Sequence, residues 1–249
     1  MHAVTMNRPA LLLLVRHAES KTNEVKKGSI YFADEEARAV LKGVPEHKIP
    51  LTPMGIRQAE RTGKYLKKRF GVFDYVYHSG YLRAVQTAEG ILKAYNDAER
   101  RHLQVRQHLF IRERDPGYTF DMTQTEAERA FPWLKEYWQT VGGFFARPVG
   151  GESLAQVSER VYLFLNMLFR DRAGKKILVV THGGTLRCFR FLLERWSYDQ
   201  ALAWPPDQKP ANCGVTVYQY DLSKKRLALR DYNLVGYKTT NSEAAVRIE

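Results

Sequence analysis

The chain contains few cysteines and no long apolar run, and both shortages narrow its class. Only two of its 249 residues are cysteines, Cys188 and Cys213, so the sequence offers neither a disulfide framework nor a zinc-binding pattern. No stretch approaches the ~18 to 20 consecutive apolar residues of a membrane helix, and Ala10–Val15 is too short for the core of a signal peptide. We therefore expect a cytoplasmic protein that does not contact a membrane.

Acidic residues are scarce relative to basic ones. The 27 Asp and Glu residues against 39 Lys and Arg residues give a formal net charge of +12, which attracts anionic partners. Basic clusters such as Lys67–Arg69 and Lys224–Arg226 lie where helix ends and turns are expected, and no nucleic-acid-binding module is present. We expect a small anionic ligand and no nucleic acid, while the oligomeric state stays open.

Helical and strand patterns alternate along the chain. Thr52-Pro53 begins a helix with a hydroxyl cap and a proline at its first position, and Ser153 with Gln156 forms a capping box before a long apolar helix that ends at Gly174. A further helix is expected over Tyr81–Tyr95. The expected strands are Leu11–Val15, Asp74–His78, Leu103–Ile111, Lys176–Val180, Gly214–Tyr220 and Leu227–Tyr232. This alternation predicts a three-layer α/β fold, with a mostly parallel central sheet and helices on both faces.

Two long polar connections interrupt this pattern. We expect one domain over residues 1–249, with a first inserted segment at residues 24–50, which contains a short helix near Asp34–Leu41, and a second inserted segment at residues 116–147. Connections of this length in compact domains are usually functional. We expect both segments to flank a ligand crevice as lids, and residues 239–249 to form a loose tail.

Polar side chains follow three of the expected strands. Arg16-His17 ends the first, Ser79 and Arg83 follow the second, and His182 follows Lys176–Thr181. Ligands of α/β sheets bind at the carboxyl ends of the strands, and a buried charge must find a partner. Alone, Arg16-His17 is equally consistent with an incidental surface pair, but cations at several strand ends favour a shared anion site.

Taken in order, these motifs resemble those of the histidine phosphatase superfamily, the phosphoglycerate-mutase-like enzymes. Each motif is short, but the ordered set is specific. Pro45–Thr52 is also similar to a stretch found in plant and fungal members. The matching segments are Arg16–Ser20 with Asn23, Leu51–Gly55 with Gln58-Ala59, Ser79 with Arg83-Ala84 and Gln86–Ala88, Glu113 with Gly117, Gly151–Leu154, Thr181–Gly183, and Asn212–Gly214.

The resemblance implies a phosphoglycerate-mutase-like fold and a phosphohistidine mechanism. Phosphoryl transfer depends on positioning and on electrostatic stabilisation of the oxygens, and planar guanidinium groups provide both. The scheme needs no metal ion and no organic cofactor. The implied site consists of His17 as nucleophile, Glu113 as proton donor to the leaving group, and Arg16, Asn23, Arg83 and His182 as phosphate ligands.

The role of Glu113 as proton donor has one alternative. A proton donor must hold its proton near neutral pH, and a bound phosphate dianion raises the pKa of a nearby carboxyl. For Glu113, the alternative is a salt bridge to Arg112 or Arg114. We interpret Glu19 and Glu152 as structural.

The segment after Glu113 separates two activities of the resembled family. It is acidic and aromatic, whereas the mutases carry basic substrate-binding residues there, so we expect a phosphomonoester hydrolase that acts on a small phosphorylated metabolite. Tyr118 and Phe120 are expected to line the mouth of the site, and Trp133 and Trp138 to pack among helices. The alternatives are a cofactor-dependent phosphoglycerate mutase and an inactive relative that binds phosphorylated ligands.

Overall fold

A six-stranded sheet forms the centre of the protein. In the computed structural model, which describes residues 6–205 and 208–238, the strands lie in the order β3-β2-β4-β1-β5-β6. Strands β3, β2, β4 and β1 run parallel, β5 is antiparallel to β1, and β6 is antiparallel to β5. The predicted mostly parallel α/β fold is confirmed. The strands are β1 (Leu11–Arg16), β2 (Tyr75–His78), β3 (Gln104–Gln107), β4 (Lys176–Thr181), β5 (Val215–Asp221) and β6 (Arg226–Leu234).

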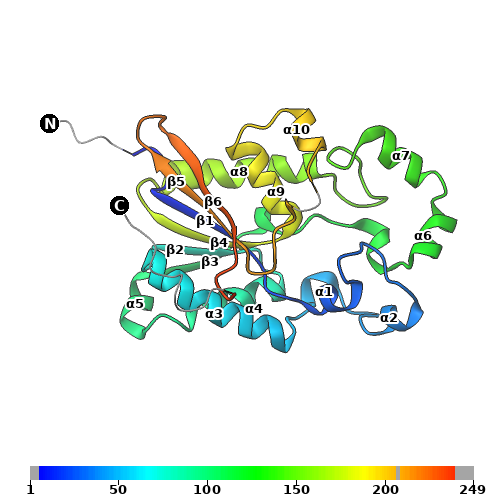
Figure 1. Ribbon diagram of the computed structural model, residues 1–249, viewed down its shortest axis with the longest axis horizontal. Helices are drawn as coiled ribbons and strands as arrows, with labels where there is room; N and C mark the ends of the chain where they lie inside the picture. The colour runs from blue at the N-terminus through cyan, green and yellow to red at the C-terminus, as the bar shows by residue number, and fades with distance from the viewer. Residues whose placement is uncertain (1–5, 206–207, 239–249) are drawn as a thin grey trace.

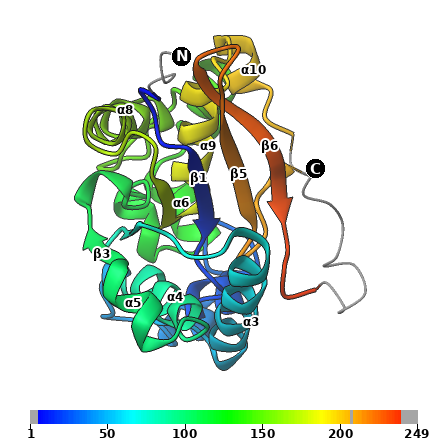
Figure 2. The same cartoon turned by 90° about the vertical axis from the view of Figure 1, so that its left-hand side faces the viewer.

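Helices cover both faces of this sheet (Figures 1 and 2). Leu12 and Leu14 of β1 pack in one core cluster with α8 (Leu154–Asp171) and α9 (Gly183–Leu193). Their neighbours Leu11, Leu13 and Val15 pack in a second cluster with α3 (Pro53–Phe70) and α4 (Leu82–Leu92). Successive side chains of a strand point to opposite faces, so a strand covered on both faces is apolar throughout, as β1 is.

The register of the two central strands brings their carboxyl ends together. Arg16 of β1 pairs with Thr181 of β4, and the amide of His17 donates to the carbonyl of Thr181 at 2.8 Å. The two predicted histidine motifs therefore leave the sheet side by side.

The two inserted segments lie beyond this edge, with α1, α2, α6 and α7 together on the right-hand side of Figure 1. They contact each other: the Phe32 amide donates to the Met122 carbonyl at 3.0 Å, and Arg38 pairs with Asp121 and Glu126. The short elements here are α1 (Lys21–Lys26), α2 (Glu35–Ala39), η1 (Glu46–Lys48), η3 (Gly117–Asp121), α6 (Gln124–Ala130) and α7 (Leu134–Val141). Elsewhere the chain forms α5 (Asp97–His102), η2 (Leu109–Ile111) and α10 (Tyr198–Leu202).

Two expectations about the elements differ from the structure. The single strand predicted over Leu103–Ile111 was wrong: β3 is a short, exposed edge strand, and the His108 side chain then accepts from the Phe110 amide and starts η2. Helix α8 ends at Asp171, and Gly174 adopts a positive φ of 70° in the turn that follows. The predicted tail at 239–249 lies outside the described residues. Within them, no helix is both long and apolar enough to span a membrane.

Candidate active site

His17 is buried directly behind the end of β1. Its side chain is 4% exposed, and its Nδ1 lies 2.7 Å from the carbonyl oxygen of Ala18, to which it donates. This hydrogen bond assigns the tautomer in which Nε2 carries a lone pair. Burial, followed by the charges of Arg83 and Arg16, lowers the pKa of His17 well below its usual value. The imidazole is therefore neutral and able to act as a nucleophile.

The loop before β5 supports the Arg16-His17 pair. Arg16 donates through Nη1 to the carbonyl of Pro210 at 2.7 Å, while its buried Nε has no hydrogen-bond partner. Asn212 donates both to the His17 carbonyl and to Oδ1 of Asn23, each at 3.0 Å. Asn23 is thereby joined to the residues that fix His17.

His182 approaches His17 from the start of α9. The two ring centroids are 5.2 Å apart. Nε2 of His182 lies 2.7 Å from the Ser79 hydroxyl, and its buried Nδ1 has no partner. Burial and then the Arg83 charge lower its pKa well below the usual value. If the Ser79 hydroxyl donates to Nε2, the proton of the neutral ring is on Nδ1, which can then donate to an oxyanion.

Arg83 reaches the same site from α4 and has an acidic partner that the sequence did not reveal. Its Nη1 donates to the backbone carbonyl of Glu46 and its Nη2 to the Glu46 carboxylate, both at 2.8 Å. Thr87 joins α4 to the end of β1, because its hydroxyl donates to the Arg83 carbonyl and accepts from the Ala18 amide. The signal for Glu46 was its place in Pro45–Thr52, the stretch that is similar to plant and fungal members of the resembled family.

Glu113 lies against the first turn of α9. Its Oε1 accepts from the amide of Arg114 at 2.9 Å, and a Cβ at position 184 would come within 2.8 Å of the same oxygen. Gly184 therefore makes room for the carboxylate. The salt bridge considered for Glu113 does not form, because Arg112 pairs with Glu152 instead, at 2.6 Å.

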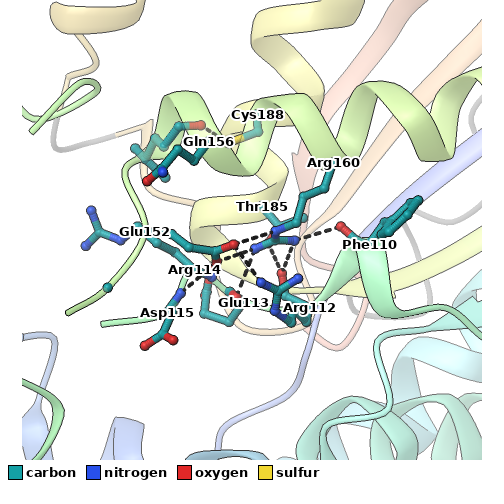
Figure 3. Close-up of polar contacts among 12 residues, drawn as sticks. Phe110, Arg112, Glu113, Arg114, Asp115, Glu152, Gln156, Arg160, Thr185 and Cys188 are labelled. Atoms are coloured by element: carbon teal, nitrogen blue, oxygen red, sulfur yellow. Dashed lines mark hydrogen bonds and ion pairs between the residues drawn. The ribbon is translucent and has the colours of Figure 1, made fainter. Parts of the chain in front are cut away.

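Arg160 of α8 holds the backbone that carries Glu113 (Figure 3). Its guanidinium donates to the carbonyls of Phe110, Arg112 and Glu113 at 2.7 to 3.0 Å. It also pairs with Glu152 at 3.0 Å. Five N–H groups in one plane suit this role, since each can donate to a different acceptor. We call Arg160 and Glu152 the brace. The structural interpretation of Glu152 agrees with these contacts, whereas no sequence pattern pointed to Arg160.

A cavity of about 640 Å³ is lined by Arg16, Glu46 and Glu113, whereas His17, Arg83 and His182 do not line it. Both inserted segments contribute to its wall, with Lys26 and Glu46 from one side and Phe120 and Trp138 from the other. Whether the segments move as lids stays a prediction. The ionic lining residues are Arg16, Lys26, Arg114, Arg187 and Lys209, with Glu46 and Glu113 as the acids.

Two of these arginines were not predicted to line the site. Among the described residues, neither Arg114 nor Arg187 has a carboxylate partner, and the buried Nε of Arg187 has no hydrogen-bond partner. Burial lowers the pKa of both groups, and the charge of Arg114 contributes to the shift of Arg187. The signal was their positions, one residue after Glu113 and five residues after His182.

The expected aromatic mouth is only partly present. Phe120 lines the cavity, but Tyr118 does not: its ring is 68% exposed and faces Gly150. Both belong to η3, and residues two apart in a helix of three residues per turn point about 120° apart. Trp138, expected to be packing only, lines the cavity, and Trp133 is half-exposed.

Metal-binding clusters are absent from the part of the chain that the structure describes: no three His, Cys, Asp or Glu side chains are grouped to hold an ion. Metal independence stays a prediction.

Sequence relatives of the chain bear mutase names. A 2,3-bisphosphoglycerate-dependent phosphoglycerate mutase of Parvibaculum lavamentivorans is 28% identical over 203 residues, which are 78% of this chain and 85% of the relative. A phosphoglycerate mutase-like protein of Arabidopsis thaliana is 32% identical over 209 residues, covering 77% of this chain and 60% of the relative.

Solved structures with the same fold bear phosphatase names. An α-ribazole phosphatase from Shigella flexneri superimposes with a TM-score of 0.69 at 22% identity, covering 93% of this chain and 100% of that one. A mycobacterial glucosyl-3-phosphoglycerate phosphatase in complex with inorganic phosphate gives 0.68 at 19% identity, covering 92% and 100%. The sequence profile of the histidine phosphatase superfamily (branch 1) matches residues 12–233. The chain belongs to this superfamily.

Proposed function

We propose that the protein is a phosphomonoester hydrolase that acts through a phosphohistidine on His17. One observation carries the proposal. The neutral, buried imidazole of His17 has two unpartnered buried nitrogen atoms as neighbours, Nε of Arg16 and Nδ1 of His182. Buried N–H groups are rarely left without acceptors, and a bound phosphoryl group supplies these two.

In the first step, Nε2 of His17 attacks the phosphorus while the ester P–O bond breaks. Arg16, Arg83 and His182 stabilise the charge on the phosphoryl oxygens, with Asn23 beside them. Glu113 transfers its proton to the leaving alcohol oxygen. The products of this step are the free alcohol and a phosphohistidine.

In the second step, water attacks the phosphohistidine. The Glu113 carboxylate accepts a proton from the water as the new P–O bond forms and the P–N bond breaks. His17 returns to its neutral form and inorganic phosphate is released. One water is consumed and the enzyme is unchanged.

The cavity wall favours hydrolysis over mutase activity. The residues that line it from 116–147 are all uncharged: Pro116, Thr119, Phe120, Leu134, Trp138 and Gly143. The unpaired cations Arg114 and Arg187 lie on other elements, which favours a small phosphorylated metabolite with an apolar part and a further negative charge.

A phosphoglycerate mutase is the second candidate, because sequence relatives that are more similar in sequence to this chain than the solved structures are carry that name. An inactive phospho-ligand-binding protein is disfavoured, since His17, Arg16, Arg83, Glu113 and His182 are all present.

Incubating the protein with a panel of phosphometabolites under ³¹P NMR separates these functions. The hydrolase releases inorganic phosphate, and we expect it to prefer 3-phosphoglycerate to glycerol 3-phosphate if the extra negative charge is recognised. Conversion of 3-phosphoglycerate to 2-phosphoglycerate with little free phosphate would identify a mutase and overturn the proposal.

A further inference from the structure

Glu46 brings a carboxylate into a site that is otherwise built to bind an anion. It comes from η1 in the first inserted segment, and its side chain is 20% exposed beside an Arg83 side chain that is 5% exposed. It lines the same cavity as Arg16 and Glu113. An ionised carboxylate beside a phosphate-binding arginine repels an anionic ligand and weakens its binding. A favourable contact between the carboxylate and the ligand would offset this repulsion.

The two oxygens of this carboxylate have different surroundings. Oε1 accepts from Nη2 of Arg83, whereas Oε2 has no hydrogen-bond partner among residues 6–205 and 208–238 and belongs to a cavity-lining side chain. Arg83 donates through both Nη atoms to Glu46, so its Nε–H and its second Nη–H bonds are left for a ligand. The carboxylate and the guanidinium thus present an acceptor and donors side by side.

The charges around Glu46 come from several elements. Burial raises the pKa of this carboxyl above its usual value, with Glu113 and Asp115 adding to the shift and the Arg83 charge opposing it. Lys26 of α1 also lies within electrostatic range, as does the Tyr81 phenol before α4. A dianion that offered no proton would face an ionised carboxylate here without a hydrogen bond between them.

We propose that Glu46 is a selectivity residue of the anion site, whose carboxylate accepts a hydrogen bond from a protonated phosphoryl oxygen and so favours hydrogen phosphate over sulfate. The two anions have the same charge and similar size near pH 8, but only hydrogen phosphate carries a proton. A carboxylate oxygen can only accept, so sulfate leaves it facing another acceptor. The inference rests on the proposed phosphate site at Arg16 and Arg83.

Calorimetric titration of the full chain with sodium phosphate and with sodium sulfate tests this, at about pH 8 and constant ionic strength. We expect wild-type protein to bind phosphate at least about tenfold more tightly than sulfate, as a hydrogen bond to a charged group implies. E46Q, which can donate to sulfate, should bring the two affinities within about threefold of each other.

Two further variants keep the test decisive. E36Q removes one exposed carboxylate from the same inserted segment, away from Arg83, and should retain wild-type discrimination. E46D keeps the charge but shortens the side chain, and should give an intermediate ratio even if E46Q folds poorly, which thermal melting would reveal.

The outcomes separate this inference from the proposed function. Equal binding of both anions by wild-type protein, or an unchanged ratio in folded E46Q, overturns the role of Glu46 and leaves the hydrolase standing. If wild-type protein binds neither anion, the phosphate site itself is wrong and both proposals fail.

Discussion

The carboxyl edge of the sheet and the rim formed by the inserted segments hold their polar residues in different ways. At the edge, His17 and His182 follow buried strands and are fixed by short hydrogen bonds to Ala18 and Ser79. At the rim, distant segments meet through long side chains, as in the Arg38 pairs with Asp121 and Glu126. In the proposed function, the reacting groups lie at the edge, directly after the core strands, whereas access and selectivity belong to the rim, which long side chains assemble.

The largest effect should follow a change at the edge. H17A removes the proposed nucleophile, and we expect kcat/KM to fall by about four orders of magnitude, as for other covalent catalysts. Steady-state kinetics on the best substrate of the panel measures this. H102A, at the exposed end of α5, is the matched control, and comparable activity in H17A and H102A would refute the edge as the catalytic region.

Arg83 lies where edge and rim meet, and its replacement should affect both rate and pH dependence. R83Q removes a phosphate ligand, for which we expect kcat/KM to fall by about 10² to 10³. The Arg83 charge lowers the pKa of His17, so that pKa should rise in R83Q. The acidic limb of the kcat/KM profile should then move to higher pH, because the imidazole of His17 stays protonated, and so unable to attack, up to a higher pH. R57Q on the surface of α3 is the control, and an acidic limb that stays in place or moves to lower pH would contradict the coupling.

The brace connects the edge to the core, and its loss should reduce stability as well as activity. R160M leaves three backbone carbonyls without their donor and removes one of the two arginine partners of Glu152, which should lower the free energy of unfolding by about 3 kcal/mol. Because Glu113 loses its support, kcat/KM should fall about tenfold. Urea denaturation and kinetics measure the two effects. R170M, on the same helix with a 76% exposed side chain, should change neither.

The smallest effect should come from the outer rim. Arg38 joins the inserted segments without lining the cavity, and the two carboxylates it pairs with across the segments are 46% and 41% exposed. We expect R38Q to change KM by no more than about threefold and to leave kcat unaltered, since exposed pairs contribute little. A large loss of kcat in R38Q would show that rim and edge are not separable.

The edge could be predicted from the sequence because each residue there adjoins a buried strand or a helix cap. An apolar run followed by Arg16-His17, and Ser153 with Gln156, are local patterns that the structure retains. Parallel pairing then brings the ends of β1 and β4 together, although the strand order itself could not be derived.

The contacts of the rim and of the brace could not be predicted because they join residues far apart in the chain. Glu46 meets Arg83 across 37 positions, and Arg160 reaches Glu113 across 47. No local pattern encodes such pairs. Tyr118 shows a related limit, because one turn of η3 decides which aromatic side chain faces the cavity.

If His17 carries the phosphoryl group during turnover, that group can be trapped on its imidazole. Wild-type protein incubated with a labelled phosphomonoester from the panel would be quenched in alkali, where phosphohistidine persists, and digested for mass spectrometry. We predict an acid-labile phosphoryl group on His17, absent from H17A. Turnover of the substrate with no label on His17, or with label on another residue, would show that His17 is not the nucleophile.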